Sequence, residues 1–360
     1  MNRTSLAAAM AAFFLALVWF VSMRQAVLFL VGVGMGGVLA GARFGFTTGW
    51  RRLIEQRDPR GVMAQLFLMA LAAAVSMPLL AAFPHDLGAA LGPPSISLVV
   101  GAFVFGAAMQ MADGCGSGTL YKAGLGIPLN MAILPVFALG SFLGSAQLEQ
   151  WLTLGAVAPV GLVGRFGPWE ALGLTCLGLA ILGAAARLWC GKAKPWFDRR
   201  LFIGAVLLAL LAVLNLAIAG QPWGVVYGFG LWVAKIAVAT GVFDPAANPF
   251  WSQPVNLTTL SQSVFLDVTS ITNIGILAGA LWIAAGQAST SASASLTARQ
   301  WTVGIIAGFL LGYSSRLAFG CNIGAMVSGI STGSVHGWIW VPLAFCGSVL
   351  GLRIRRHFGY

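Results

Sequence analysis

Long apolar runs with few charges fill this sequence and restrict what it can fold into. Only 8% of its 360 residues are charged, against roughly 25% in soluble globular domains. That excludes a cytosolic enzyme, a nucleic-acid-binding protein and a disordered chain. Because a helix needs about 20 apolar residues to cross a bilayer, the sequence predicts an all-α polytopic membrane protein surrounded by lipid. The runs lie near residues 6–23, 26–42, 61–83, 96–112, 128–147, 168–188, 201–219, 225–241, 263–285, 301–316 and 336–352.

Lysine and arginine predict the orientation, because cytoplasmic loops of membrane proteins are rich in both. The net charge is +11, and twelve of the twenty basic residues form three clusters that we expect in the cytoplasm. The connectors 84–95 and 149–167 hold only Arg165 and should lie outside. The clusters are Arg51, Arg52, Arg57 and Arg60; Arg187, Lys192, Lys194, Arg199 and Arg200; and Arg353, Arg355 and Arg356.

Crossing parity then fixes the number of spans. Five apolar runs separate the second cluster from the third, yet two cytoplasmic ends require an even number of crossings. We therefore expect run 225–241 to be re-entrant and, by the same reasoning, run 26–42. The predicted topology has nine spans plus two re-entrant segments, with the N-terminus outside and the C-terminus in the cytoplasm.

Two sequence motifs occur twice in the same order and predict an internal repeat. Residues 106–118 and 312–324 both have the pattern G-x7-G-C-x-x-G, and residues 43–49 and 235–241 both have a cation followed by x4-T-G. Each predicted half has four spans and the linker crosses the membrane once. The second half therefore starts on the opposite side of the membrane from the first, as in the inverted repeats of many secondary transporters. The predicted organisation is a first repeat at 1–148, a linker with one crossing helix at 149–200, and a second repeat at 201–360.

The paired motifs supply the candidate pathway residues. Cys115 and Cys321 hold equivalent positions, so pseudo-symmetry would bring them together near the axis. A thiol is a weak donor and a polarizable group, which suits a solute with a sulfur end. The alternative is that both cysteines only pack, as buried cysteines commonly do. The flanking glycines would let the backbone approach a solute; they are Gly114, Gly118, Gly320 and Gly324.

Ionisable residues at membrane depth are expensive and mark functional sites. Arg316 lies five residues before Cys321, where the first repeat has Gln110. Arg43 and Lys235 precede the two predicted re-entrant turns, and Thr240 follows Lys235 in the second of them. The two cations either attract anions at the two openings of the pathway or anchor the chain at the membrane interface. Asp113 is expected to pair with Lys122. The sequence contains no metal-ligand or nucleotide-binding motif, so we expect no cofactor and no metal.

At these residues the sequence resembles the YeeE/YedE family of bacterial inner-membrane proteins, the thiosulfate uptake transporters. The matching stretches are 106–118, which includes Asp113-Gly114-Cys115-Gly-Ser-Gly118, and 316–329, which includes Gly320-Cys321-Asn-Ile-Gly324. The resemblance implies an hourglass-shaped inverted repeat in which thiosulfate passes along cysteine thiols at a central constriction. It also implies a small TusA-like sulfur carrier as a partner on the cytoplasmic side.

One position departs from the family pattern. The family commonly has a third functional cysteine in the first re-entrant turn, where this chain has Gly45 or Thr47. The predicted function is a permease for thiosulfate or a related sulfur or selenium oxyanion. The alternatives are a membrane-embedded thiol redox enzyme and a small-anion channel for an unrelated substrate.

Overall fold

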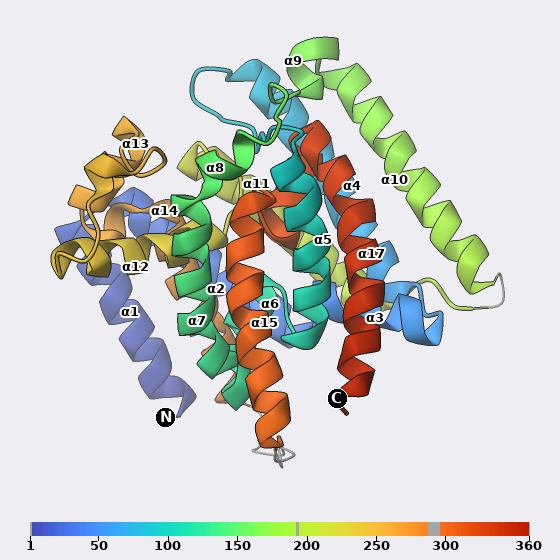
Figure 1. Cartoon of the computed structure of the whole chain (residues 1–360), viewed down its shortest axis with the longest axis horizontal. Helices are drawn as coiled ribbons and strands as arrows, with labels where there is room; N and C mark the ends of the chain where they lie inside the picture. Colours follow the sequence, from blue (N-terminus) through green and yellow to red (C-terminus); the bar gives the residue numbers. More distant parts are fainter. Residues whose placement is uncertain (1, 192–193, 287–295, 360) are drawn as a thin grey trace.

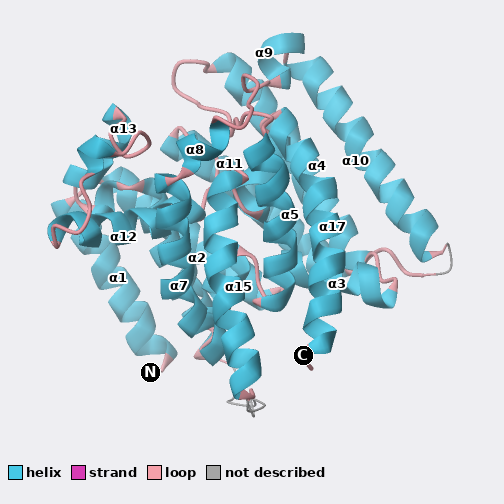
Figure 2. Ribbon diagram, viewed as in Figure 1, coloured by secondary structure: helices cyan, strands magenta, loops and turns pink. Residues whose placement is uncertain are grey.

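Apolar runs become helices along the whole chain. The computed structural model describes residues 2–191, 194–286 and 296–359, and no strand occurs among them (Figures 1 and 2). The helices are α1 (Arg3–Phe20), α2 (Met23–Gly41), α3 (Phe46–Gln56), α4 (Arg60–Ala82), α5 (Ile96–Met111), α6 (Gly116–Gly124), α7 (Pro128–Ala146), α8 (Leu148–Leu152), α9 (Leu162–Phe166), α10 (Pro168–Cys190), α11 (Arg199–Ala219), α12 (Val226–Ala239), η1 (Pro245–Ala247), α13 (Pro254–Ser261), η2 (Val264–Leu266), α14 (Val268–Ala284), α15 (Ala298–Leu317), η3 (Asn322–Ser328), α16 (Gly329–Ser331) and α17 (Val335–His357).

Nine helical stretches in the described part of the chain are long and apolar enough to cross a bilayer. This confirms the predicted all-α polytopic membrane fold. The nine stretches differ from the nine predicted spans in one member. The stretch Met23–Gln56 is added, while α14, at the predicted span 263–285, has only 17 residues and falls below this length, although its last turn reaches the basic end beside Arg3.

The prediction that run 26–42 is re-entrant is wrong. Residues Met23–Gly41 form one uninterrupted helix of 19 residues, capped at its start by the Ser22 side chain. The chain breaks only after this run, where Arg43 has a left-handed φ of 51°. Run 225–241, in contrast, forms α12, whose 14 residues span roughly 20 Å, short of the hydrocarbon thickness of about 30 Å.

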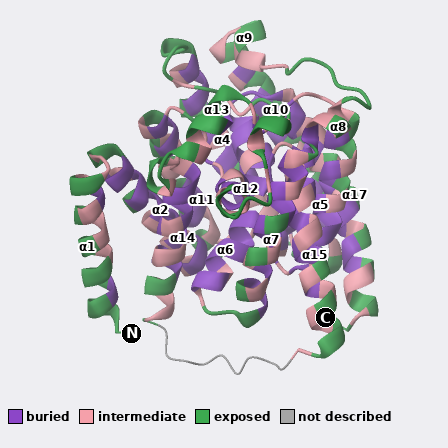
Figure 3. Cartoon of the chain, turned by 60° about the vertical axis from the view of Figure 1, so that its left-hand side comes forward, coloured by how far each residue is buried: buried purple, intermediate pink, exposed green. Residues whose placement is uncertain are grey.

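Buried residues concentrate where the central helices meet, while α1 and α9 at the edge of the view carry many exposed residues, as does α10 (Figure 3). The closest helix pairs are α2 with α14, α5 with α17, and α7 with α15. In addition, α5 packs along α15. Ser97 at the start of α5 donates to the carbonyl of Leu317 at the end of α15. These two helices therefore run in opposite directions.

The same glycine contact joins α5 to α17 and α15 to α7. A Cβ atom added at Gly106 would overlap the carbonyl of Ala344, and one at Gly312 would overlap the carbonyl of Phe137. Gly106 and Gly312 are 206 residues apart. In return, a Cβ at Gly347 would overlap the carbonyl of Phe103, and one at Gly140 that of Phe309. Phe103 and Phe309 are again 206 residues apart. The absence of side chains lets these helix backbones touch.

The three basic clusters lie together at one end of the molecule. Arg60 forms an ion pair with Asp198 at 3.9 Å, and Arg356 pairs with Glu55 at 2.9 Å. A hydrogen bond from Arg60 also lowers the pKa of Asp58. The connectors 84–95 and 149–167 meet elsewhere, where the amide of Val157 donates to the carbonyl of Pro94 at 2.9 Å. Lys192, a member of the second cluster, lies outside the described residues.

The N-terminus lies at the basic end, which differs from the predicted orientation. The Arg3 guanidinium stacks on the ring of Trp282 at 4.8 Å, near the end of α14. Trp282 and Arg200 line the same groove, and Arg200 donates to the carbonyl of Gly41 at the end of α2. Figure 1 likewise shows both chain ends on its lower side. The difference arises because α2 is a full-length helix and adds one crossing to the first half.

Candidate substrate site

Cys115 and Cys321 begin two short helices in the interior. Cys115 caps α6 and Cys321 caps η3, a π-helical turn. Each Sγ accepts a hydrogen bond from a backbone amide of its own helix at 3.4 Å, from Gly118 and Ile323 respectively. Both thiols are fully buried and free. The sequence prediction that the two residues hold matching places is consistent with this shared capping geometry.

The two capped turns face each other across the centre. A Cβ atom at Gly116, the residue after Cys115, would lie 3.2 Å from the Sγ of Cys321. The preceding residues also match, because Asp113 and Phe319 both have left-handed backbone, with φ of 55° and 56°. They too are 206 residues apart. Such backbone is rare for bulky residues, and it turns each chain back toward the middle.

The predicted glycines serve these turns in different ways. Gly320 has a φ of 148°, which side-chain-bearing residues rarely adopt, and a Cβ atom there would overlap the amide of Ala325. A Cβ at Gly114 would lie 2.9 Å from the amide of Thr119. At Gly118 it would lie 3.4 Å from the Sγ of Cys115, while at Gly324 its nearest neighbour would be 3.9 Å away. Gly320 and Gly114 are thus required by the turns, whereas Gly118 and Gly324 keep space open beside the thiols.

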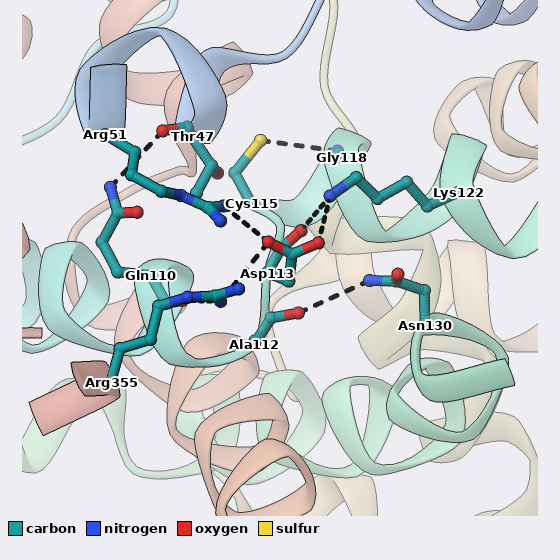
Figure 4. A network of polar contacts seen from close by, with 10 residues as sticks. All are labelled: Thr47, Arg51, Gln110, Ala112, Asp113, Cys115, Gly118, Lys122, Asn130 and Arg355. Carbon is teal, nitrogen blue, oxygen red and sulfur yellow. Dashed lines mark hydrogen bonds and ion pairs between the residues drawn. The ribbon is translucent and has the colours of Figure 1, made fainter. Parts of the chain in front are cut away.

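Thr47 and Gln110 border the Cys115 side of this centre (Figure 4). Thr47 lies in the first turn of α3, and its carbonyl accepts a hydrogen bond from Nε2 of Gln110 at 3.5 Å. Gly45 caps the same helix, and a Cβ atom there would lie 3.6 Å from the hydroxyl of Tyr121. The first broken segment brings Thr47 beside Gln110 near the Cys115 turn, with Gly45 at the start of the same helix. It does so through α3, which follows the predicted re-entrant run.

A cluster of four charged side chains adjoins Cys115 (Figure 4). The carboxylate of Asp113 lies 2.5 Å from Arg51, 2.6 Å from Lys122 and 3.4 Å from Arg355. The predicted pair between Asp113 and Lys122 is confirmed. Three cations share one carboxylate, so this inner charge cluster has an excess of positive charge. Arg51 and Arg355 were missed as site residues because they come from α3 and α17, far away in the sequence.

Arg316 lies on the Cys321 side and has a different set of neighbours. Its Nε donates to Oγ of Ser145 at 2.7 Å, and its guanidinium lies over the rings of Tyr227 at 5.6 Å and Phe250 at 5.3 Å. None of the described Asp or Glu side chains forms an ion pair with it. A cation held this deep without a carboxylate is costly unless an anion visits it.

The remaining three predicted residues do not share one arrangement. Arg43 follows α2 and lines a small pocket with Gly45, at the side of α3. Lys235 lies within α12 and donates to the carbonyls of Leu260 at 2.7 Å and Gln262 at 2.5 Å, so it ties α13 to α12. Thr240 is exposed at the end of α12, where its hydroxyl bonds the carbonyl of Ile236.

These positions correct the second motif pair. Thr47 is buried at the start of α3, whereas Thr240 is exposed at the end of α12. The two cation-x4-T-G stretches are therefore not structural equivalents, and their sequence match has no counterpart in the fold.

Several buried polar atoms around this centre lack hydrogen-bond partners. Within the described residues, both side-chain amide atoms of Asn322 lack a hydrogen-bond partner, as do the hydroxyls of Thr47 and Thr119 and Oε1 of Gln110. Each such atom costs about 1–3 kcal/mol. Several together indicate a place that water or a polar solute fills. Asn322 was missed by the sequence reasoning, although it directly follows Cys321, where the first repeat has Gly116.

Membrane-spanning helices that surround short helices meeting at a buried polar centre define a multi-pass membrane transporter. The sequence model of the sulphur transport family matches residues 41–350. The chain belongs to this family.

Two relatives agree with the assignment. The chain is 25% identical over 335 residues to the "Thiosulfate transporter TsuA" of Spirochaeta thermophila, covering 86% of this chain and 92% of that protein. It is 26% identical over 152 residues to the "Probable transporter YedE" of Escherichia coli, covering 42% of this chain and 37% of that protein. The family and these relatives show a membrane transporter of sulfur compounds rather than an enzyme.

Proposed function

We propose that the protein takes up thiosulfate, or a closely related sulfur-containing anion, through a constriction formed by Cys115 and Cys321. The observation that carries the proposal is the pair of buried thiols on two facing turns, beside polar atoms that lack partners. A thiol that keeps its proton can approach an anion without repelling it, and its polarizable sulfur suits the sulfur end of thiosulfate. The thiosulfate transporter of Spirochaeta thermophila supports the choice of substrate.

Charged side chains on either side of the constriction supply the oxyanion contacts in this proposal. Arg316 precedes Leu317, which contacts the start of α5 near the connectors, and thus lies on the side away from the basic end. The inner charge cluster lies on the basic side of Cys115. An anion would pass from Arg316 to the thiols and then to the cluster. Guanidinium groups bind oxyanions well, because their donors are charged and planar.

An inverted repeat is part of the same proposal, with the halves at 1–148 and 201–360 and the linker at 149–200. Its support is the matched glycine contacts, the matched left-handed residues and the opposite directions of α5 and α15. The packing pairs α5 with α15 and α7 with α17 as equivalent helices. Between them, α6 is equivalent to η3 together with α16. The pair α2 and α14 matches the pair α11 and α4, with α11 in the place of α2 and α14 in the place of α4. The predicted match of α11 with α1 is therefore replaced by a match of α11 with α2.

We further propose that the protein lies in the bacterial inner membrane with its basic end in the cytoplasm. The support is the convergence of the three basic clusters. The C-terminus then lies in the cytoplasm as predicted, and the N-terminus joins it there. A TusA-like sulfur carrier would meet this basic surface. Uptake of a dianion against 100 mV costs about 4.6 kcal/mol, so it needs a co-transported cation or rapid consumption inside.

Uptake of radiolabelled thiosulfate into proteoliposomes tests the proposal. We expect saturable uptake that unlabelled thiosulfate competes away and that sulfate, which lacks the sulfur end, inhibits weakly. Empty liposomes are the control. Equal inhibition by sulfate and thiosulfate would instead favour a general small-anion channel, and absence of uptake would contradict the proposed substrate.

A further inference from the structure

An open apolar groove runs along the surface between α2, α11 and α14. Its volume is about 750 Å³, and three glycines of α2, Gly34, Gly37 and Gly41, hollow one wall. A Cβ atom at Gly37 would have no neighbour within 4 Å. Arg199 and Arg200 line the groove at the start of α11, and these two are its only charged lining residues among those described. The groove is thus apolar along its length and cationic at one end.

The depth of the groove identifies the kind of molecule that fits. Along α2 its lining runs from Val33 to Ala42, which is roughly 14 Å of helix axis at 1.5 Å per residue. That is about half of the 30 Å hydrocarbon core, the depth of one leaflet. A membrane-spanning helix of a partner protein would be about twice as long as the groove. An acyl chain from the leaflet at the basic end matches the length.

The charge at the end of the groove identifies the headgroup. Arg200 donates through Nε to the carbonyl of Gly41 at 3.1 Å, which holds its guanidinium across the end of α2. Arg3, stacked on Trp282, adds a third cation at this end. The carboxylate nearby, Asp198, already caps α11 and pairs with Arg60. Basic pockets between membrane helices on the cytoplasmic side bind anionic lipid headgroups.

We propose that this groove is a binding site for an anionic glycerophospholipid, with one acyl chain along α2 and its phosphate between Arg199 and Arg200. The lipid would lie against the turn that leads to the substrate site. A Cβ atom at Gly204, in the groove wall, would lie 3.0 Å from Cβ of Ala42 and 3.3 Å from Phe44. Phe44 directly precedes Gly45, the cap of α3. Lipid in the groove therefore supports the segment that holds Thr47.

Native mass spectrometry of the purified protein tests the site without any substrate, so it is independent of the proposed transport activity. Phosphatidylglycerol is the probe, and the zwitterionic phosphatidylcholine, which has no net charge, is the control. Two variants change the groove: the double variant Arg199→Gln/Arg200→Gln removes the charge, and Gly37→Leu fills the apolar part. Their matched controls are Arg353→Gln, at an exposed arginine of the same basic end, and Gly173→Leu, at a glycine with open space on α10.

We expect the parent protein to retain phosphatidylglycerol in preference to phosphatidylcholine. The arginine double variant should lose roughly fivefold in phosphatidylglycerol affinity per charge removed, hence some twenty-five-fold. Gly37→Leu should lose retention of both lipids, and both control variants should bind like the parent. Equal retention of the two lipids by the parent, or full retention by both groove variants, would show only non-specific annular lipid and overturn the proposal. Circular dichroism of each variant confirms that it is folded.

Discussion

Cys115 and Cys321 differ from the other cysteines in what surrounds them. Each caps a short helix at the centre, whereas Cys176 and Cys346 are exposed on the outer surface of the bundle and Cys190 lies at the end of α10. If the two central thiols contact the passing anion, replacing either with alanine removes a donor that water replaces poorly in a narrow passage. An unsatisfied group costs about 1–3 kcal/mol, so uptake should fall roughly 5- to 150-fold.

The serine and control variants separate a contact from a packing role. Cys115→Ser and Cys321→Ser keep the size but replace a polarizable donor with a hard one, so they should lose nearly as much uptake as the alanine variants. The variants Cys176→Ala, Cys190→Ala and Cys346→Ala should transport like the parent. The measurement is proteoliposome uptake per folded protein, with thermal stability determined alongside. Parental uptake in Cys115→Ala and Cys321→Ala would mean that both residues only pack.

Arg316 should bind the oxyanion end of the substrate, because its guanidinium lies among rings and a hydroxyl without a carboxylate partner in the described structure. A hydrogen bond to a charged group contributes about 1.5–3 kcal/mol, so Arg316→Gln should raise the KM of uptake by roughly 10- to 150-fold. Arg316→Lys should restore part of the loss, since it keeps the charge but not the planar fork. Arg165→Gln, in the connector 149–167 away from the basic end, is the matched control. An unchanged KM in Arg316→Gln would remove this residue from the pathway.

The residues that sequence alone identified are those marked by the repeated motif. Cys115, Cys321 and the glycines of their turns share a spacing that survives in both halves. Asn322, Arg51 and Arg355 could not be found in that way. Asn322 replaces a glycine of the other half, and the two arginines reach Asp113 from segments far away in sequence. Only the three-dimensional structure shows which arginines of a basic cluster point into the protein interior.

At the scale of elements, the helix pairs α5 with α17 and α7 with α15 are the units most open to test. Adding a methyl group at Gly106 or Gly312 would force the paired backbones apart, and overpacking of this kind costs about 1–3 kcal/mol. We expect Gly106→Ala and Gly312→Ala to lower the thermal unfolding temperature by similar amounts, since the two glycines occupy matching places. Gly173→Ala, with open space around it, should not. Strongly unequal effects at Gly106 and Gly312 would contradict the proposed equivalence.

The inner charge cluster joins three elements, because Arg51 is on α3, Lys122 on α6 and Arg355 on α17, all around Asp113. In Asp113→Asn the three cations would face one another without a counter-charge. We expect a lower thermal stability, together with tighter but slower passage of the anion: a lower KM and a lower kcat for uptake. The exposed Asp244→Asn serves as the control. A variant with parental stability and kinetics would leave Asp113 without a role in transport.

Element prediction succeeded where long apolar runs decide the structure and failed where helices break. The span-length runs are all present as helices, because bilayer thickness sets their length. The parity argument placed a re-entrant segment at 26–42, but the break follows that run, at the left-handed Arg43. Hydropathy does not record where a helix ends at membrane depth, since buried backbone can be satisfied there by other parts of the protein.

At the scale of the whole molecule, charge divides the protein into two ends. The basic clusters meet at one end through Arg60 with Asp198 and Arg356 with Glu55, while the two connectors with a single arginine meet elsewhere. This asymmetry is what the positive-inside rule selects during insertion. In the proposed orientation it also gives an entering anion a field that becomes more positive toward the cytoplasm, which offsets part of the opposing membrane potential.

The orientation of the two termini is the final test at this scale. Arg3 lies against Trp282 at the basic end, and the C-terminal helix α17 ends there as well, with Arg356 on Glu55. We therefore expect a reporter that is active only in the cytoplasm to give full signal when fused to either terminus. A reporter inserted in the connector 149–167 should be silent, which provides the internal control. If the N-terminal fusion were silent while the C-terminal fusion was active, α1 would have to enter from outside. The two crossings, α1 and α2, that the structure places before the first basic cluster would then be wrong.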